Sequence, residues 1–568
     1  MTASTGFIPK NGTLNSWDDI KPYFDTLIET KPNTTQELEL LLIQYSETVA
    51  WFAEENAWAY IKMTCDTENK EKVARYELFA TEIAPQLEVA TNTFEKQLST
   101  FSTFEQLDAE RYGQLKKNIQ RSLEMFRDEN VLLDAKLSKL GSDFSQVSGG
   151  ITVTLDGEEM PIPRAATRLE LKDREKRKEA WMAISEAYQS VSDKLDAIFA
   201  EMLSLRIEVA KNAGYKNFRD YQHDNYHRFD YTPADAEEFS KSIEKYVVPL
   251  SRDINERHRK KLGLAQDDYR PWDGNAFGPD EEPLKPFKTG DELLDKTIDI
   301  FSELHPQFGD NLKAMKKANL FDLESRKGKS PGGYNYGLEQ TGMPFIFMNA
   351  AGTQSNLTTL MHEGGHAMHT FLTADEPLIQ YRDTPMEMAE TASMSMELMT
   401  SGLWNKFYNE ADHRLARRKH LEGIIGLLPW VATVDSFQHW IYLNPDHTPD
   451  ERDAAFKAIN ERFGAINMNK EGLDKLLQKR WQRQIHIFEV PFYYIEYGIA
   501  QLGALQVYRN FKSNPKLGLD GYIKGLSLGS TKPMPEVWDV MNIKFDFSSD
   551  TIRELMEFVQ SELEALQD

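Results

Sequence analysis

The chain has 568 residues, of which 40% are hydrophobic and 27% charged, and it carries a formal net charge of −24 at pH 7. This composition is typical of a globular protein, and the length predicts about two to four structural units. Binding to a phosphate backbone needs basic patches, so the acidic balance excludes nucleic acid as a predicted partner. The same charge disfavours an anionic membrane surface.

Cysteine usage and the start of the chain predict the compartment. Cys65 is the single cysteine, so the sequence holds no disulfide framework of the kind that small secreted proteins use. No catalytic signature surrounds it, and we expect a buried or half-buried thiol. Residues 1–10 lack a basic segment followed by an apolar run, and no later stretch of about 18 uninterrupted apolar residues occurs. We therefore expect a cytoplasmic protein without a membrane partner.

Apolar periodicity predicts helices over much of the first half of the chain. From about 14 to 140, apolar and aromatic residues recur at spacings of three and four, which favours a core between long helices over a ligand-binding stripe. Within 149–163, β-branched residues alternate and lead into Asp156-Gly157, which indicates a β-hairpin. Helical periodicity resumes from about 168 to 213. The hairpin either rims a cleft or caps the helices, and both interpretations stay open.

Two histidines in the next segment have a spacing that can bind a metal ion. His223 and His227 are four residues apart, which on a helix places both rings on one face. The intervening Asp224-Asn225 favours a turn, so we expect surface or substrate-contact histidines there. The stretch 270–290, rich in Pro, Gly and acidic residues, is the clearest linker.

A short, apolar, β-prone stretch covers 343–349 and follows a Gly-Tyr segment at 332–337. Because proline cannot donate a backbone hydrogen bond, Pro344 predicts an edge strand rather than a central one. An exposed edge can bind an extended peptide as one more strand, held by main-chain hydrogen bonds. A plain strand without that role is the alternative.

The most informative motif is His362-Glu363-Gly364-Gly365-His366, an H-E-x-x-H pattern on a helix predicted over 355–372. Two imidazoles one turn apart can bind a single Zn²⁺, and the glutamate beside them can act as a general base. This pattern predicts a metallopeptidase. A catalytic zinc usually takes three protein ligands and leaves its fourth position for water, so a third ligand is needed. We expect His369 to be structural or to support a ligand.

The candidate third ligands lie on a Met-rich, Ala-rich helix predicted over 385–405. A third histidine ten residues after the first is excluded, because Leu372 occupies that position. Glu390 and Glu397 are two turns apart on one side of the predicted helix, so one can bind the metal while the other orients a ligand histidine. Glu387, one turn before Glu390, is the competing ligand.

Residues 360–369 and 390–397 resemble the zinc site of the thimet oligopeptidase and oligoendopeptidase F family, and that of oligoendopeptidase F most closely. In that family the first glutamate of the second motif is the third zinc ligand, a role that falls on Glu390 here. The resemblance therefore implies one Zn²⁺ per chain, bound by the two histidines of the motif and Glu390. The chain departs from the family at Gly364, where a bulky residue is usual.

The resemblance extends to a downstream segment. Hydrolysis of a peptide builds negative charge on the carbonyl oxygen, which hydrogen-bond donors stabilise. In the family a histidine and tyrosines supply these donors, and His486, Tyr494 and Tyr497 match that pattern. Tyr494 and Tyr497 are spaced to share a helix face, and Tyr493 is a rival for Tyr494. Packing in the core with a satisfied hydroxyl is the alternative role for each tyrosine.

The predicted fold class is mainly α, a multi-helix zincin-type metallopeptidase with a small β-sheet beside the active-site helix. The resemblance adds a deep central cleft. We expect an N-terminal helical domain over 1–200 and a catalytic zinc peptidase domain over 201–568.

The predicted function is that of a zinc-dependent endopeptidase that hydrolyses short to medium oligopeptides. A zinc dipeptidyl carboxypeptidase or carboxypeptidase is the alternative, and an enclosed Arg or Lys that binds a carboxylate would favour it. A non-catalytic peptide-binding scaffold is a second alternative, and the complete set of ligands and base counts against it. The predicted partners are oligopeptide substrates, and a monomer is favoured.

Overall fold

The computed structural model describes residues 5–9, 12–326, 328–330, 332–464 and 467–566. Contacts between residues group the chain into two compact units, each assembled from three segments that lie far apart in the sequence. Unit 1 consists of Met1–Glu124, Leu284–Ala416 and Gly503–Phe545, and unit 2 of Met125–Pro283, Arg417–Leu502 and Asp546–Asp568. The predicted domain boundary at residue 200 stays a prediction.

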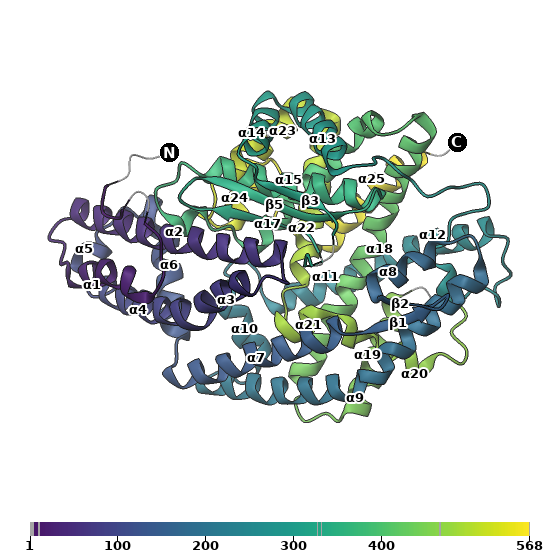
Figure 1. The fold of residues 1–568 in the computed structure, drawn as a ribbon, viewed down its shortest axis with the longest axis horizontal. Helices are drawn as coiled ribbons and strands as arrows, with labels where there is room; N and C mark the ends of the chain where they lie inside the picture. Colours follow the sequence, from purple (N-terminus) through teal and green to yellow (C-terminus); the bar gives the residue numbers. More distant parts are fainter. Residues whose placement is uncertain (1–4, 10–11, 327, 331, 465–466, 567–568) are drawn as a thin grey trace. The chain divides into compact units, whose positions relative to one another are not determined.

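Unit 1 holds the N-terminal helices, a three-stranded sheet and the helices that follow it (Figure 1). Its helices and strands are α1 (Lys21–Glu29), α2 (Thr35–Cys65), α3 (Lys70–Leu78), α4 (Ala84–Leu98), α5 (Ser102–Glu105), α6 (Ala109–Met125), α13 (Gly290–Leu304), α14 (Pro306–Lys317), β3 (Phe321–Glu324), β4 (Tyr334–Leu338), β5 (Met343–Ala350), α15 (Gln354–Thr373), α16 (Ile379–Arg382), α17 (Met386–Thr400), α23 (Pro515–Leu526) and α24 (Met534–Val540). Tyr45 of α2 stacks on Phe94 of α4 with ring centroids 4.5 Å apart, inside an apolar core that the helical periodicity predicts.

Unit 2 is built from long helices and a two-stranded hairpin. Its elements are α7 (Asp128–Gly149), β1 (Thr152–Leu155), β2 (Glu158–Pro161), α8 (Ile162–Ala166), α9 (Arg174–Asn212), α10 (Phe218–Asn225), α11 (Pro233–Tyr246), α12 (Val248–Lys261), α19 (Pro449–Phe463), α20 (Asp474–Leu477), α21 (Ile485–Glu489) and α25 (Ser549–Glu564). The helices α18 (Glu410–Leu443) and α22 (Ile495–Ser513) contain residues of both units, and the last residue of α6, Met125, also belongs to unit 2. The predicted mainly α class is thus confirmed.

The hairpin predicted from Asp156-Gly157 is present. Strands β1 and β2 pair antiparallel, and the two turn residues have positive φ angles of 52° and 79°. Such angles at both central positions define the tight turn that Asp-Gly favours. Met160 of the hairpin packs with Ala180 and other apolar residues of α9, so the hairpin covers this helix.

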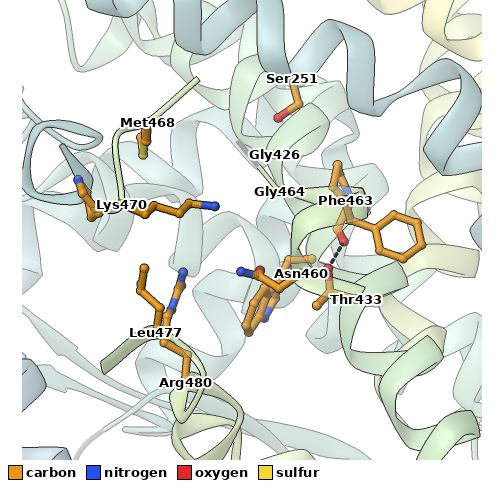
Figure 2. Close-up of a pocket in the computed structure, with 13 residues that line it drawn as sticks. Ser251, Gly426, Thr433, Asn460, Phe463, Gly464, Met468, Lys470, Leu477 and Arg480 are labelled. Atoms are coloured by element: carbon orange, nitrogen blue, oxygen red, sulfur yellow. Dashed lines mark hydrogen bonds between the residues drawn. The ribbon is translucent and has the colours of Figure 1, made fainter. Parts of the chain in front are cut away.

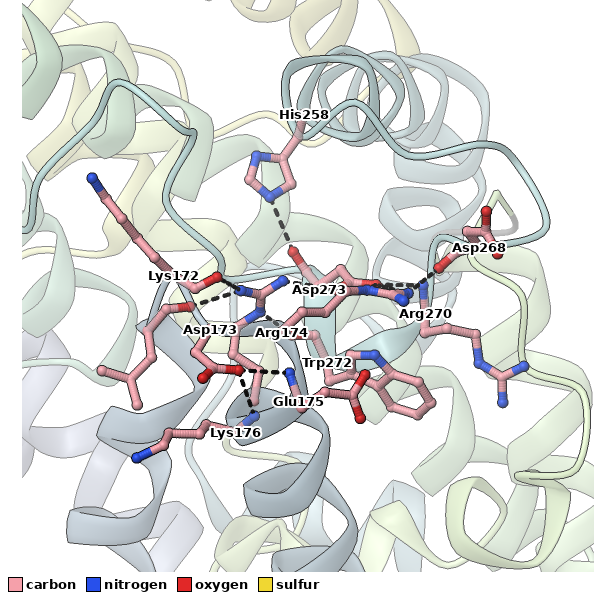
Figure 3. Close-up of polar contacts among 12 residues, drawn as sticks. Lys172, Asp173, Arg174, Glu175, Lys176, His258, Asp268, Arg270, Trp272 and Asp273 are labelled. Atoms are coloured by element: carbon pink, nitrogen blue, oxygen red, sulfur yellow. Dashed lines mark hydrogen bonds and ion pairs between the residues drawn. The ribbon is translucent and has the colours of Figure 1, made fainter.

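The stretch around residue 270 is anchored rather than loose. Asp273 is fully buried, and Arg174 and Arg177 at the start of α9 each lie 2.9 Å from its carboxylate. Burial alone would raise the pKa of Asp273, but the two arginines outweigh it and lower that pKa. Figure 3 shows this contact next to Asp173, whose side chain accepts the N–H groups of residues 175 and 176 and so caps α9. The segment therefore belongs firmly to unit 2.

The three-stranded sheet of unit 1 has the order β3-β5-β4, with β5 parallel to β3 and antiparallel to β4. The prediction that the strand with Pro344 lies at an edge is therefore wrong, since β5 is central. Pro344 is nevertheless placed where its missing N–H costs little. It pairs with Gly337 of β4, whereas the pairing with β3 starts only at Ile346. An edge of the sheet is instead formed by β4.

In the part of the chain that the structure describes, no helix is both long enough and apolar enough to cross a membrane.

Candidate active site

The H-E-x-x-H motif lies on α15, which approaches α17 closely because of a glycine. A Cβ atom at Gly365 would stand 2.6 Å from the Cα atom of Ser393 and 2.8 Å from the carbonyl oxygen of Ala392. Backbone atoms on the neighbouring helix cannot easily move away, so this contact requires glycine. The approach lets side chains from both helices meet at one point.

The second glycine of the motif is explained by an aromatic ring. A Cβ atom at Gly364 would stand 2.5 Å from Cζ of Phe301, a fully buried residue of α13. The ring occupies the space that a side chain on α15 would need. This contact accounts for the glycine at a position where the resembled family usually has a bulky residue.

His362, His366 and Glu390 converge within unit 1. Their potential ligand atoms all lie within 4.8 Å of one another, and among the described residues they form the single group of three or more side chains that could hold a metal ion. Oε2 of Glu390 lies 3.2 Å from Nε2 of His362 and 3.7 Å from Nε2 of His366. Two imidazole nitrogens and a carboxylate oxygen are a known catalytic set for Zn²⁺, so the residues present fit that ion.

Two further side chains of α17 orient these ligands. Nδ1 of His362 lies 2.7 Å from Oε1 of Glu397, so the carboxylate holds the Nδ1 proton and directs Nε2 toward Glu390. The hydroxyl of Ser393 donates to Oε2 of Glu390 at 3.1 Å. Glu387, the competing ligand, is buried on the same helix but lies outside the metal-binding group.

Neighbouring glutamates have opposite pKa shifts. Glu363 is only 6% exposed, and burial raises its pKa to about 7. Burial also opposes the charge of Glu390, but the hydrogen bond with His362 and the nearby imidazoles outweigh it and lower that pKa to about 2. Glu390 is therefore suited to remain a charged ligand. Glu363 is suited to exchange a proton near neutral pH.

Strand β4 lies beside the motif. The side-chain amide of Asn335 donates to the carbonyl oxygen of Glu363 at 3.5 Å, and a backbone hydrogen bond from Asn335 lowers the pKa of the Glu363 carboxyl against the effect of burial. An edge of the sheet thus runs next to the candidate general base.

In unit 2 the structure brings together the predicted oxyanion donors. The ring centroid of His486 lies 4.8 Å from that of Tyr494, 5.7 Å from that of Tyr497 and 6.2 Å from that of Tyr493. Tyr494 precedes α22, so the two predicted donors do not share a helix face, yet their rings lie 5.2 Å apart. Burial raises the pKa of Tyr494 to about 12, so its hydroxyl keeps its proton at neutral pH.

Gln484 determines which nitrogen of His486 carries the proton. Trp430 Nε1 can only donate, and it donates to Oε1 of Gln484 at 3.0 Å. The amide nitrogen of Gln484 therefore faces Nδ1 of His486, at 2.7 Å, and donates to it. In the neutral imidazole the proton then sits on Nε2, which makes Nε2 a donor. The sequence pattern singles out neither Gln484 nor Trp430; the position of Gln484 two residues before His486 is the available signal.

A buried ion pair holds the tyrosine segment in place. Arg228 pairs with Glu496, both nearly inaccessible to solvent, and also donates to the carbonyl oxygen of Phe492 at 2.7 Å. Tyr231 donates to the same carboxylate at 2.9 Å. Phe492 has a positive φ of 65°, and its N–H donates to Gln438 at 2.8 Å. Contacts from distant parts of unit 2 therefore enforce the unusual backbone before Tyr494.

The other histidines for which the sequence predicts a role lie outside the metal-binding group. Nε2 of His223 lies 2.8 Å from the backbone carbonyl of Tyr231. His227 follows the end of α10 and has a positive φ of 54°, so the two rings do not share a helix face. His369 is buried on α15, and burial lowers its pKa to about 3, which keeps the ring neutral.

A helix-borne H-E-x-x-H pair completed by a glutamate from a second helix is the arrangement of zincin metallopeptidases. Residues 168–557 match peptidase family M3, and residues 13–126 match the M3 N-terminal domain. The chain belongs to peptidase family M3. The predicted resemblance to the oligoendopeptidase F group is confirmed by this match together with curated relatives that are named oligoendopeptidase F homologues.

Individual relatives agree with this assignment. The chain is 25% identical to "Oligopeptidase PepF" of Bacillus subtilis (strain 168) over 385 residues, which cover 66% of this chain and 55% of that protein. It is 23% identical to "Group B oligopeptidase PepB" of Streptococcus agalactiae serotype III (strain NEM316), with 61% of this chain and 55% of that protein covered. The chain thus spans about half the length of these curated relatives.

A solved structure of Pz peptidase A with an inhibitor has the same fold. Its TM-score is 0.91 at 27% sequence identity, and the match covers 98% of this chain and 99% of that one. The predicted zincin-type fold with a small sheet beside the active-site helix is confirmed. The deep central cleft stays a prediction.

Proposed function

We propose that the protein is a zinc-dependent endopeptidase that hydrolyses oligopeptides. The observation that carries this proposal is the convergence of His362, His366 and Glu390 directly beside a buried Glu363. Membership of peptidase family M3 supports it, and so do the curated relatives, which are named oligopeptidases and oligoendopeptidases.

The proposed mechanism assigns a separate role to each side chain. When bound, Zn²⁺ would polarise the scissile carbonyl and lower the pKa of a bound water. Glu363, buried beside the two histidines on the same helix, would act as the general base and pass the proton that it takes to the leaving amine. Glu397 would keep His362 in the tautomer that presents Nε2 to the metal.

We assign the stabilisation of the oxyanion to His486, Tyr494 and Tyr497. The resemblance supports this assignment, and so does the cluster that their rings form within unit 2. The contact of Gln484 with Nδ1 leaves a proton on Nε2 of His486, which can donate to a developing negative charge.

For the substrate, we propose an extended oligopeptide that pairs with the edge strand β4. Main-chain pairing would hold it in register next to Glu363 without demanding particular side chains. Cleavage within the peptide is preferred to removal of residues from its C-terminus. The cytoplasmic location and the monomeric state stay predictions.

The test is hydrolysis of a quenched fluorogenic peptide of about ten residues, with products identified by mass and with zinc content measured on the same samples. We expect internal cleavage that a chelator abolishes and added zinc restores. Glu363→Gln should keep its zinc and lose activity by about a thousandfold or more, since the base acts in the transition state.

The alternatives give different results. Stepwise loss from the C-terminus would favour the carboxypeptidase alternative. A zinc-loaded wild-type protein that cleaves no member of a varied peptide pool would favour the non-catalytic scaffold. Full activity of Glu363→Gln would contradict the role assigned to Glu363.

A further inference from the structure

A pocket of about 170 Å³ lies within unit 2 and is lined by none of the metal-binding or proposed catalytic side chains, although Trp430, which orients Gln484, forms one of its walls. It is lined by residues of α12, α18, α19 and α20 and by the segments that connect to them (Figure 2). Its apolar wall includes Trp430, Phe463 and Met468. A single water needs only about 10–15 Å³, so the volume admits a larger group.

Two cations enter this pocket without a carboxylate partner. Figure 2 shows the ammonium of Lys470 and the guanidinium of Arg480 pointing into a common space, which the amide of Asn460 also faces. Among the described residues neither cation forms an ion pair. Burial lowers the pKa of both groups, and Arg480 lowers that of Lys470 further. The charges are held together although they repel each other.

The charged groups around Lys470 do not relieve this repulsion. Arg252 and Lys457 add positive charge and lower the pKa of Lys470, whereas Glu461 raises it. Glu461 is exposed and itself lies 4.0 Å from Lys457. Arg480 lies over the ring of Trp430, 5.2 Å from its centroid, which orients the guanidinium but supplies no negative charge. An anion bound in the pocket would compensate the positive charges of Lys470 and Arg480.

The volume and the lining of the pocket indicate which kind of anion it can bind. Its volume is below the roughly 300 Å³ at which sites for drug-sized ligands begin, so it suits a ligand about as large as one amino-acid residue. A bare inorganic ion would leave the apolar wall uncovered. A carboxylate suits the planar fork of Arg480, and an apolar body would cover the half-buried Trp430 and Met468.

We propose that this pocket binds a small carboxylate with an apolar body, whose charged end meets Lys470 and Arg480. The free C-terminal residue of a peptide is one source of such a group, and a free N-acylated amino acid or another small organic acid is the second. The peptide source rests on the proposed function, whereas the carboxylate chemistry does not.

The test is calorimetric titration of the full-length, zinc-loaded protein with N-acetyl-phenylalanine and with its amide. The amide has the same body without the charge, so we expect the acid to bind about tenfold or more tightly. Lys470→Met and Arg480→Met should each weaken binding of the acid by about tenfold or more. Lys475→Met, an exposed lysine on α20 outside the pocket lining, should leave the dissociation constant unchanged.

Two glycine-to-methionine variants test whether the ligand binds in this pocket without changing any charge. Gly426 lines the pocket, and a Cβ atom there meets nothing within 4 Å. Gly426→Met should therefore fill the pocket and weaken binding without disturbing the fold. Gly423→Met places the same side chain one turn earlier on α18, also in open space but outside the lining, and should bind the acid as the wild type does.

Two further titrations identify the source of the carboxylate. An eight-residue peptide with a free or an amidated C-terminus is titrated into Glu363→Gln, which should not cleave it. Binding of the free acid that depends on Lys470 would identify the peptide C-terminus, whereas binding of the N-acetylated amino acid alone would identify small organic acids. Both results support the pocket chemistry.

Other outcomes would overturn the proposal. These are equal binding of acid and amide, inorganic phosphate binding as tightly as N-acetyl-phenylalanine, or unchanged binding in Lys470→Met and Gly426→Met. Failure of the endopeptidase assay with intact, Lys470-dependent binding would refute the proposed function alone. Full endopeptidase activity without any binding of the acid would refute the pocket alone.

Discussion

The metal-binding group of unit 1 and the His-Tyr cluster of unit 2 are positioned in different ways. His362 and His366 are one turn apart on a single helix, so the local helix geometry already places both rings. The segment from His486 to Tyr497 contains a short helix, a turn with a positive φ at Phe492 and the start of another helix. Its shape depends on side chains that come from far away in the sequence.

The contacts of the second region show this dependence. Arg228 reaches Glu496 and the carbonyl oxygen of Phe492, and Arg206 of α9 donates to the carbonyl oxygens of Ile487 and Phe488. These arginines are more than 260 residues away from their partners in the sequence. Local helix geometry therefore positions the side chains of the metal-binding group, whereas buried polar contacts across unit 2 position those of the His-Tyr cluster.

The largest effect is expected from breaking the ion pair that supports the second region. Arg228→Met leaves the carboxylate of Glu496 buried without its cation, which should lower the free energy of unfolding by about 3–5 kcal/mol. Urea unfolding followed by circular dichroism measures the loss. Arg553→Met, at an exposed pair on α25, should change it by less than about 1 kcal/mol. Equal stability of Arg228→Met and wild type would mean that the segment holds its shape without the pair.

The next effect concerns the close contact between helices in the first region. Gly365→Ala would force α15 and α17 apart, because the new Cβ atom meets backbone 2.6 Å away. We expect a loss of about 1–3 kcal/mol in the free energy of unfolding, together with weaker zinc binding as Glu390 moves from the histidines. Gly423→Ala, in open space on α18, should instead stabilise by up to about 1 kcal/mol. The prediction fails if both alanine variants are stabilised.

The metal-binding region shows which features the sequence predicts and which it does not. The spacing of His362, Glu363 and His366 predicts their common location, because the periodicity of one helix is sufficient. The contact between Gly364 and Phe301 could not be predicted, since it joins residues 63 positions apart on two helices. The central place of β5 was missed for a similar reason. Pro344 suggests an edge, and only the register with β3 shows that pairing on that side starts at Ile346.

A smaller effect is expected from the carboxylate that orients His362. Glu397→Gln keeps an acceptor near Nδ1 but removes the charge, which should weaken zinc binding by about 10–100-fold. Competition with a chromogenic chelator measures the affinity. Glu387→Gln, on the same helix but outside the metal-binding group, should change it by less than about threefold. If Glu387→Gln loses zinc while Glu390→Gln retains it, the third ligand has been assigned to the wrong glutamate.

The smallest effect distinguishes the two tyrosines of the second region. Tyr494→Phe should lower kcat about tenfold with little change in KM, because a neutral hydrogen bond contributes about 0.5–1.5 kcal/mol. Burial raises the pKa of Tyr494 to about 12, so the hydroxyl remains a donor and the loss should be uniform from pH 6 to pH 9. Tyr493→Phe is the matched control, since its ring is farther from His486. A tenfold loss in Tyr493→Phe with none in Tyr494→Phe would reverse the assignment, and a loss in Tyr494→Phe that shrinks as the pH rises would show that the hydroxyl of Tyr494 loses its proton in this range. A reversed assignment would mean that the sequence pattern identifies the right segment, whereas the long-range contacts that fix its backbone present the hydroxyl of Tyr493 instead.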